Sequence, residues 1–165
     1  MAAIEAPGAN RPAQVLLLRV QDRWLAMDLR HVERIFLLMD LQPVPQGPAC
    51  LAGLMDYHGQ SLAVFDLGLW LGLPEPVSYD AATPIILCDT PAGRAAFVVR
   101  EVAGVEAVPP AAVMPLDVGG APFQGTLGFS TGMALLLDMD RVLASIRSGW
   151  VDDSGRKQIN GYRMS

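Results

Sequence analysis

The chain has 165 residues, of which 52% are hydrophobic and 18% charged, and its 12 basic and 17 acidic side chains leave a net charge of −5. This length suits one domain with a hydrophobic core, and a charged fraction below the about 25% of ordinary domains excludes a disordered chain. Because no stretch gathers the basic residues, the protein is not expected to bind nucleic acid. The apolar excess favours a protein that binds other proteins.

Two features predict a soluble, cytoplasmic protein. Residues 1–13 form a predicted flexible leader, because they are rich in Ala, Pro, Gly and Asn and lack the apolar segment of an export signal. The longest apolar runs, such as residues 35–39 and 95–99, have five residues, whereas a membrane-spanning helix needs about 20. We therefore expect no direct membrane insertion.

The first part of the chain predicts two hairpins. Residues 15–20 and 24–29 are apolar strands joined by a polar turn, and residues 53–67 place a polar turn at 56–59 between two further apolar arms. Between the hairpins, apolar residues spaced by three or four predict one or two helical turns over residues 30–34. The Pro-rich stretch that follows predicts a sheet edge or a loop.

The rest of the chain predicts more short strands. A short helix is expected at 68–73, followed by a Pro-rich seam at 74–82. Residues 109–125 lack periodicity and predict a long surface loop, and residues 140–146 predict a helix before a polar tail at 149–165. Four strands are predicted in this half, at residues 84–88, 95–99, 102–108 and 132–139. Short strands at intervals of about 8–12 residues are typical of small barrels or sandwiches.

The sequence predicts no catalytic group, cofactor or metal site. Cys50 and Cys88 lack a Cys-x-x-Cys motif and a nearby histidine pair, so we expect two small buried side chains rather than zinc ligands or a disulfide. Asp138 and Asp140 lie where a strand ends and a helix begins, which predicts helix capping. Glycine-rich phosphate loops are absent from the sequence, and no catalytic triad is predicted. We therefore expect a protein that is not an enzyme.

The two histidines differ in their surroundings. His31 lies beside Glu33 and Arg34, where a solvated side chain is expected. His58 lies at the tip of a polar hairpin between apolar strands, which favours a contact residue over an ordinary turn residue. A single histidine without a partner is a poor catalyst, so we assign it no catalytic role.

The order of these features resembles the CheW-like chemotaxis coupling proteins, a family of chemosensory adaptors. The resemblance rests on residues 24–36, the Pro-rich stretch, the block at 53–67 and the Leu-Leu-Leu-Asp of residues 135–138. It implies a CheW-like domain over residues 14–148 and a mostly β fold. That fold has two small five-stranded SH3-like β-barrels packed through a shared hydrophobic core, with short helices. The first barrel is expected at about 14–75 and the second at about 83–140.

The resemblance also implies a function. Such a protein is a non-enzymatic adaptor that couples the tip of a methyl-accepting chemoreceptor to the regulatory domain of a histidine kinase in a bacterial chemosensory array. The receptor helices would lie in an apolar groove between the barrels. The residues that match the binding positions of the family are Val32, Arg34, Gly53, His58, Pro84 and Ala96. Val32 and Gly53 are expected to line the groove without supporting the core.

Three positions depart from the family pattern. The chain has His58 where the family commonly has Arg, Arg34 where Glu is frequent, and Arg100 where Asp is common. These departures predict a specialised receptor or kinase, in a system with an output other than swimming. The alternative function is a small β-barrel that binds a hydrophobic ligand, although no convergent polar groups mark a pocket.

Overall fold

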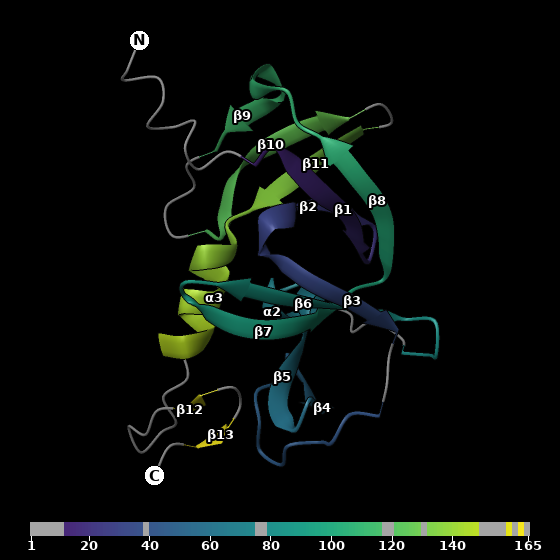
Figure 1. Cartoon of the computed structure of the whole chain (residues 1–165), viewed down its shortest axis with the longest axis vertical. Helices are drawn as coiled ribbons and strands as arrows, with labels where there is room; N and C mark the ends of the chain where they lie inside the picture. Colours follow the sequence, from purple (N-terminus) through teal and green to yellow (C-terminus); the bar gives the residue numbers. More distant parts are fainter. Residues whose placement is uncertain are drawn as a thin grey trace.

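The described part of the chain is mostly β, with two sheets and a few short helices (Figure 1). The computed structural model describes residues 12–37, 40–74, 79–116, 121–129 and 132–148, together with the backbone of residues 158–159 and 162–163. None of the described helices is long and apolar enough to span a membrane. The mostly β prediction is confirmed, as are the two predicted hairpins.

The first sheet has six strands in the order β8-β1-β2-β11-β10-β9. Its strands are β1 (Gln14–Val20), β2 (Arg23–Asp28), β8 (Glu101–Ala107), β9 (Val113–Pro115), β10 (Phe123–Phe129) and β11 (Gly132–Leu137). β1 and β2 form a hairpin, and β2 then pairs in parallel with β11. This parallel pair joins the two ends of the described chain in one sheet.

The second sheet has five strands in the order β3-β6-β7-β5-β4. Its strands are β3 (Val32–Leu37), β4 (Leu51–Tyr57), β5 (Gln60–Asp66), β6 (Pro84–Thr90) and β7 (Gly93–Val98). β4 and β5 form one hairpin, β6 and β7 form another, and β7 pairs in parallel with β5.

The two sheets share one pairing pattern. In each, two hairpins meet through a parallel pair, and a further strand, β8 or β3, adds antiparallel to one outer edge. The chain closes the five-stranded sheet beyond β3, because Gln42 N–H donates to the Leu54 carbonyl at 2.8 Å and Leu54 N–H donates to the Gln42 carbonyl at 2.9 Å. The segment that follows β3, at one edge of the sheet, is thereby hydrogen-bonded to β4 at the other edge.

The division of the chain between the sheets differs from the predicted one at about 14–75 and 83–140. The five-stranded sheet uses residues 32–98 continuously, whereas the six-stranded sheet combines residues 14–28 with residues 101–137. The prediction failed because only some strand pairs have a local sequence signal. A hairpin can be predicted from its turn residues, whereas the parallel pairing of β2 with β11 has no signal in the residues that connect them.

Three hydrophobic clusters explain how the sheets pack. β1 sends Val15 and Leu17 into a cluster of the six-stranded sheet, while Leu16 and Leu18 point to a larger cluster shared by both sheets. The five-stranded sheet encloses a cluster of its own and adds its other face to the shared one. Each sheet is thus buried on both faces, as expected for two small barrels packed through a shared core.

The helices pack on the shared cluster. α2 (Leu67–Trp70) contributes Leu67, and α3 (Met139–Ser148) contributes Val142 and Ile146. Both helices were predicted. α3 lies at one side of the molecule against the five-stranded sheet (Figure 1).

Two predicted elements differ in the structure. The helical turns predicted over residues 30–34 are limited to the 3₁₀ helix η1 (Leu29–His31), and residues 32–34 belong to β3. Residues 109–125 are not one long loop, because the 3₁₀ helix η2 (Pro110–Ala112), β9 and the start of β10 lie there. Residues 1–11 of the leader and most of the tail lie outside the described residues. The described part of the tail is the short pair β12 (Gln158–Ile159) and β13 (Tyr162–Arg163).

Candidate interaction surface

All six predicted contact residues belong to the five-stranded sheet. Val32 and Arg34 lie in β3, Gly53 in β4, His58 in the β4–β5 turn, Pro84 at the start of β6 and Ala96 in β7. Arg34 and His58 are exposed, and Val32 and Pro84 are half-buried. Val32 and Arg34 therefore belong to a strand and not to the predicted short helix.

Two of the six residues are buried. Ala96 is fully buried in the cluster of the five-stranded sheet, beside Val64 and Leu87. Its side chain supports the interior of the sheet and presents no surface to a partner.

Gly53 supports the closure of the five-stranded sheet. A Cβ atom at this position would lie 2.8 Å from the Gln42 carbonyl oxygen, and the backbone φ of Gly53 is +154°. The pairing of β4 with β5 is also irregular between Leu51 and Gly53. The absence of a side chain lets the segment around Gln42 approach β4, so Gly53 does not have the predicted role of lining a groove without supporting the core.

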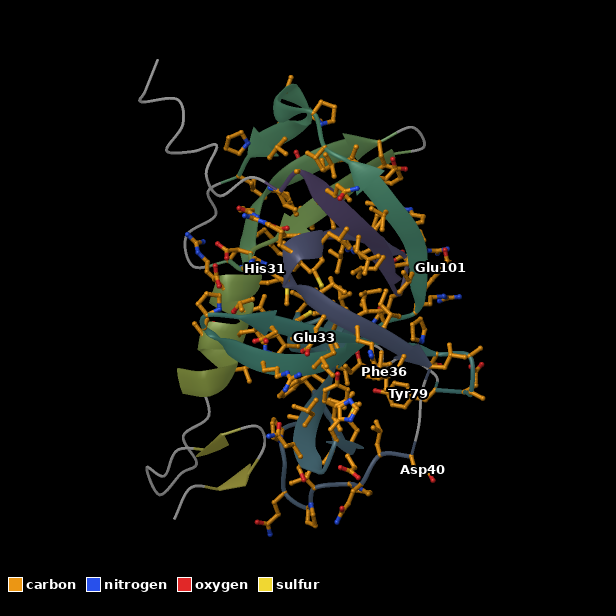
Figure 2. All side chains as sticks on the ribbon, in the orientation of Figure 1. His31, Glu33, Phe36, Asp40, Tyr79 and Glu101 are labelled. Carbon is orange, nitrogen blue, oxygen red and sulfur yellow. The ribbon has the colours of Figure 1, made fainter. Side chains whose placement is uncertain are left out.

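Aromatic and charged side chains gather near the exposed predicted residues. We call this group the aromatic rim, and it consists of Glu33, Arg34, Phe36, Tyr57, His58 and Arg94. The rings of Phe36 and Tyr57 meet edge to face with centroids 5.6 Å apart, and the rings of Tyr57 and His58 meet similarly at 4.3 Å. Glu33 and Phe36 lie along β3 in Figure 2. Such edge-to-face contacts hold aromatic rings in fixed relative positions.

An ion pair connects two strands at the rim. The Nη2 atom of Arg94 lies 2.6 Å and 2.7 Å from the two carboxylate oxygens of Glu33, and Nε donates to Glu33 at 3.0 Å. The Arg94 guanidinium also lies 5.1 Å from the centroid of the Tyr57 ring. Hydrogen bonding to Glu33 raises the pKa of Arg94 above its ordinary value.

The hairpin turn holds His58 outward. His58 has φ 51° and Gly59 has φ 80°, the conformation of a tight two-residue hairpin turn. The Gly59 N–H donates to Asp56 Oδ1 at 3.0 Å. Asp56 thus stabilises the turn, and the His58 ring rests against Tyr57.

β3 carries exposed apolar side chains next to the rim. Ile35 is 43% exposed and Leu37 is 63% exposed. Arg34 and Phe36 alternate with them and lie on the other face of β3, with the Arg34 guanidinium carbon 5.9 Å from the centroid of the Phe36 ring. Glu33, Phe36 and Arg94 were not predicted from the sequence as members of this surface, because their contacts join strands far apart in the chain.

The other candidate residues have structural surroundings. Asp138 Oδ1 accepts from the Arg141 N–H at 3.2 Å, so the predicted capping role is confirmed. Cys88 is buried with its sulfur 3.3 Å from that of Met27, and burial raises the pKa of its thiol. Cys50 is half-buried, and both cysteines are free thiols. No group of three or more metal-ligating side chains occurs among the described residues.

His31 is not the solvated side chain that we predicted. It is half-buried, and its Nδ1 atom is buried with no hydrogen-bond partner among the described residues. It lines a cavity of about 680 Å³ between η1, the β6–β7 turn and α3. Most of the polar lining consists of charged side chains, including Asp28, Arg30 and Asp140.

Comparison with known proteins agrees with the fold. The crystal structure of the scaffolding protein TtCheW from Thermoanaerobacter tengcongensis is similar, with a TM-score of 0.68 over 77% of this chain and 89% of that chain, at 16% sequence identity. No curated protein matches the chain. The family described as CheW-like domain matches residues 14–147. The chain therefore belongs to the CheW-like domain family.

Proposed function

We propose that this protein is a cytoplasmic, non-enzymatic adaptor that couples a methyl-accepting chemoreceptor to a histidine kinase in a bacterial chemosensory array. Membership of a family of scaffold proteins supports this role. The observation that carries it is the pair of exposed apolar side chains on one face of β3, Ile35 and Leu37. A cluster of exposed large apolar side chains often marks a surface that a partner covers.

The receptor contact is proposed at β3 and the aromatic rim. Ile35 and Leu37, two residues apart on β3, supply apolar area on one face of the strand for a receptor helix. Arg34 lies on the other face with the aromatic rim, and Arg34 and His58 are proposed as polar contacts there. Pro84 pairs with Leu37 across the β3–β6 ladder, so it would lie at the border of the same surface. Amphipathic helices bind apolar surfaces of this kind.

The kinase contact is proposed on the six-stranded sheet. Met114 and Met133 are 68% and 64% exposed. They pair with Thr126 and Gly128, which are two residues apart on β10, so both methionines lie on one face of the sheet. Methionine adapts its shape to a partner, and Gly128 leaves a flat space between them.

The alternative function, binding of a hydrophobic ligand, finds no support at the cavity beside His31. That cavity is lined largely by charged and polar side chains. Hydrophobic ligands favour apolar linings with few polar groups.

Calorimetry with two fragments tests the proposal. The fragments are the receptor-tip helical hairpin and the kinase regulatory domain from the same genome, and both should bind with roughly micromolar affinity. Leu37→Asp should weaken receptor binding roughly tenfold and leave kinase binding unchanged, and Met133→Asp should do the reverse. Each variant thus controls for the other. No heat of binding with either fragment at high micromolar concentration would contradict the adaptor function.

A further inference from the structure

The cavity beside His31 encloses a nitrogen atom that the described part of the protein leaves without a partner. The cavity has a volume of about 680 Å³ between η1, the β6–β7 turn and the start of α3, and Figure 2 shows His31 at this place. The Nδ1 atom of His31 is buried and has no hydrogen-bond partner among the described residues. A single water occupies only about 30 Å³, so the cavity has room for a small ligand.

Both guanidinium groups of the lining are already paired with carboxylates. The Arg30 guanidinium donates to the two carboxylate oxygens of Asp28, at 2.6 Å and 3.2 Å. The Arg141 Nε atom lies 3.4 Å from a carboxylate oxygen of Asp138, and its Nη1 atom donates to a backbone carbonyl at 3.1 Å. The lining therefore offers no unpaired positive charge to an anionic ligand.

Hydrogen-bond acceptors are in excess in the same lining. It contains three carboxylates against two guanidinium groups, and the third carboxylate, Asp140, forms no ion pair or hydrogen bond with the described residues. The His31 Nδ1 atom is a further group that can accept a hydrogen bond. The lining thus suits a ligand that carries positive charge and N–H donors.

The fold does not require a cavity at this place, because the equivalent place beside Asp66 is closed. Asp66 and Asp138 each follow the second strand of a hairpin and cap the helix that comes next. At Asp66 the end of β1 packs so closely on α2 that a Cβ atom at Gly68 would lie 2.7 Å from Val20. Asp140 stands at the position of Gly68, two residues after the capping aspartate, and it lines the cavity. The open, charged lining is therefore a property of this sequence rather than of the fold.

We propose that this cavity binds a cation with N–H donors, namely a guanidinium or primary ammonium group. The cation would form a charge-assisted hydrogen bond with the Asp140 carboxylate and donate a second hydrogen bond to His31 Nδ1. The group belongs either to a free small amine or to an Arg or Lys side chain of a partner protein, since both share this chemistry. The proposal is independent of the receptor and kinase contacts proposed above, which involve other residues.

NMR titration of the isotope-labelled protein tests the site with two small cations. Methylguanidinium carries N–H donors, whereas tetramethylammonium has the same charge and no N–H group. At constant ionic strength, methylguanidinium should shift the ring resonances of His31 and the backbone resonances of residues 138–144, with millimolar affinity. Tetramethylammonium should bind roughly fivefold more weakly or worse. No shifts with methylguanidinium, which would leave water as the occupant of the cavity, or equal shifts with both cations would overturn the proposal.

Two variants separate the proposed contacts. Asp140→Asn removes the charge with little change in size and should weaken methylguanidinium binding roughly tenfold, and His31→Leu should weaken it roughly three- to fivefold. Asp22→Asn is the matched control, because Asp22 is an exposed carboxylate in the β1–β2 turn, and it should bind within about twofold of the wild-type protein. Circular dichroism checks that the variants fold. Equal affinities for Asp140→Asn and Asp22→Asn would also overturn the proposal.

Calorimetry with the receptor-tip hairpin and the kinase regulatory domain identifies the source of the cation. If a partner supplies it, Asp140→Asn weakens the binding of that fragment and Asp22→Asn does not. If a free amine is the ligand, both variants bind both fragments as the wild-type protein does. Either result supports a cation site once methylguanidinium binds as expected. Failure of the wild-type protein to bind either fragment would contradict the proposed function and leave the NMR test of the cavity intact.

Discussion

Glu33 and Arg94 lie 61 residues apart in the sequence and form a two-pronged ion pair over β6, the strand that separates β3 from β7. The pair ties the edge strand β3 to the centre of the five-stranded sheet. It also places Arg94 over Tyr57, next to His58. The ion pair therefore orders the surface that we assign to the receptor.

A double-mutant cycle of Glu33→Gln and Arg94→Gln should show a coupling energy of about 0.5–1 kcal/mol in the free energy of unfolding. This value is modest because solvent screens two side chains that are about one-third exposed. Urea denaturation of the four proteins measures it. Strictly additive effects of the two substitutions would show that the ion pair does not stabilise the sheet.

Gly53→Ala should lower the free energy of unfolding by about 1–3 kcal/mol, because its Cβ atom would press against the Gln42 carbonyl in a backbone conformation that side chains rarely adopt. Gly128→Ala is the control. A Cβ atom at Gly128 meets nothing within 4 Å, so its effect should stay within about 0.5 kcal/mol. Equal stabilities of the two variants in urea denaturation would argue against Gly53 as the closing point of the sheet.

Tyr79→Phe should destabilise the protein at pH 8 by about 1–2 kcal/mol, because the Tyr79 hydroxyl donates to the buried Asp66 carboxylate at 3.0 Å. Burial, followed by the nearby charge of Asp66, raises the pKa of Tyr79 above its ordinary value. The phenol therefore ionises more readily in the unfolded chain, where its pKa is about 10. The stabilising contribution is complete below that pH and is lost as the pH rises further.

The measurement is urea denaturation between pH 8 and 11. Above pH 10 the stability of Tyr79→Phe should fall less steeply than that of the wild-type protein. Tyr57→Phe removes a hydroxyl from the rim and serves as the control at pH 8, with an expected change within about 0.5 kcal/mol. Parallel stability curves for Tyr79→Phe and the wild-type protein would contradict the role of the Asp66 contact.

His58→Arg should raise the affinity for the receptor-tip hairpin by up to about 1 kcal/mol, because a guanidinium can make a charge-assisted hydrogen bond to an acidic group of the receptor. The nearby carboxylate of Asp56 is engaged by the Gly59 N–H. Calorimetry of both proteins with the receptor-tip hairpin provides the test. Equal affinities would reduce His58 to an ordinary turn residue.

Local features of the fold could be predicted from the sequence. Short stretches of neighbouring residues predict the Asp56–Gly59 turn, the hairpin strands and the α3 helix. The helical spacing of Val32 and Phe36 was misleading, because a register shift between Val32 and Arg34 changes which face each side chain occupies. Alternation along a strand could not be recognised across that irregularity.

The candidate surface could be predicted only in part. Arg34 and His58 were identified through the family resemblance, and both are exposed. The sequence could not show that Ala96 and Gly53 are buried, unlike Arg34 and His58. Their burial depends on how the five-stranded sheet assembles and closes through Gln42. The ion pair between Glu33 and Arg94 could be recognised only from the strand order β3-β6-β7.

The most direct test of the adaptor function is whether one molecule of this protein holds both partners at once. The receptor-tip hairpin and the kinase regulatory domain are mixed with and without the protein and analysed by size-exclusion chromatography with light scattering. We predict a ternary complex whose mass is the sum of the three components, lost with Leu37→Asp or Met133→Asp. Competition, in which each partner displaces the other and no ternary complex forms, would contradict the account.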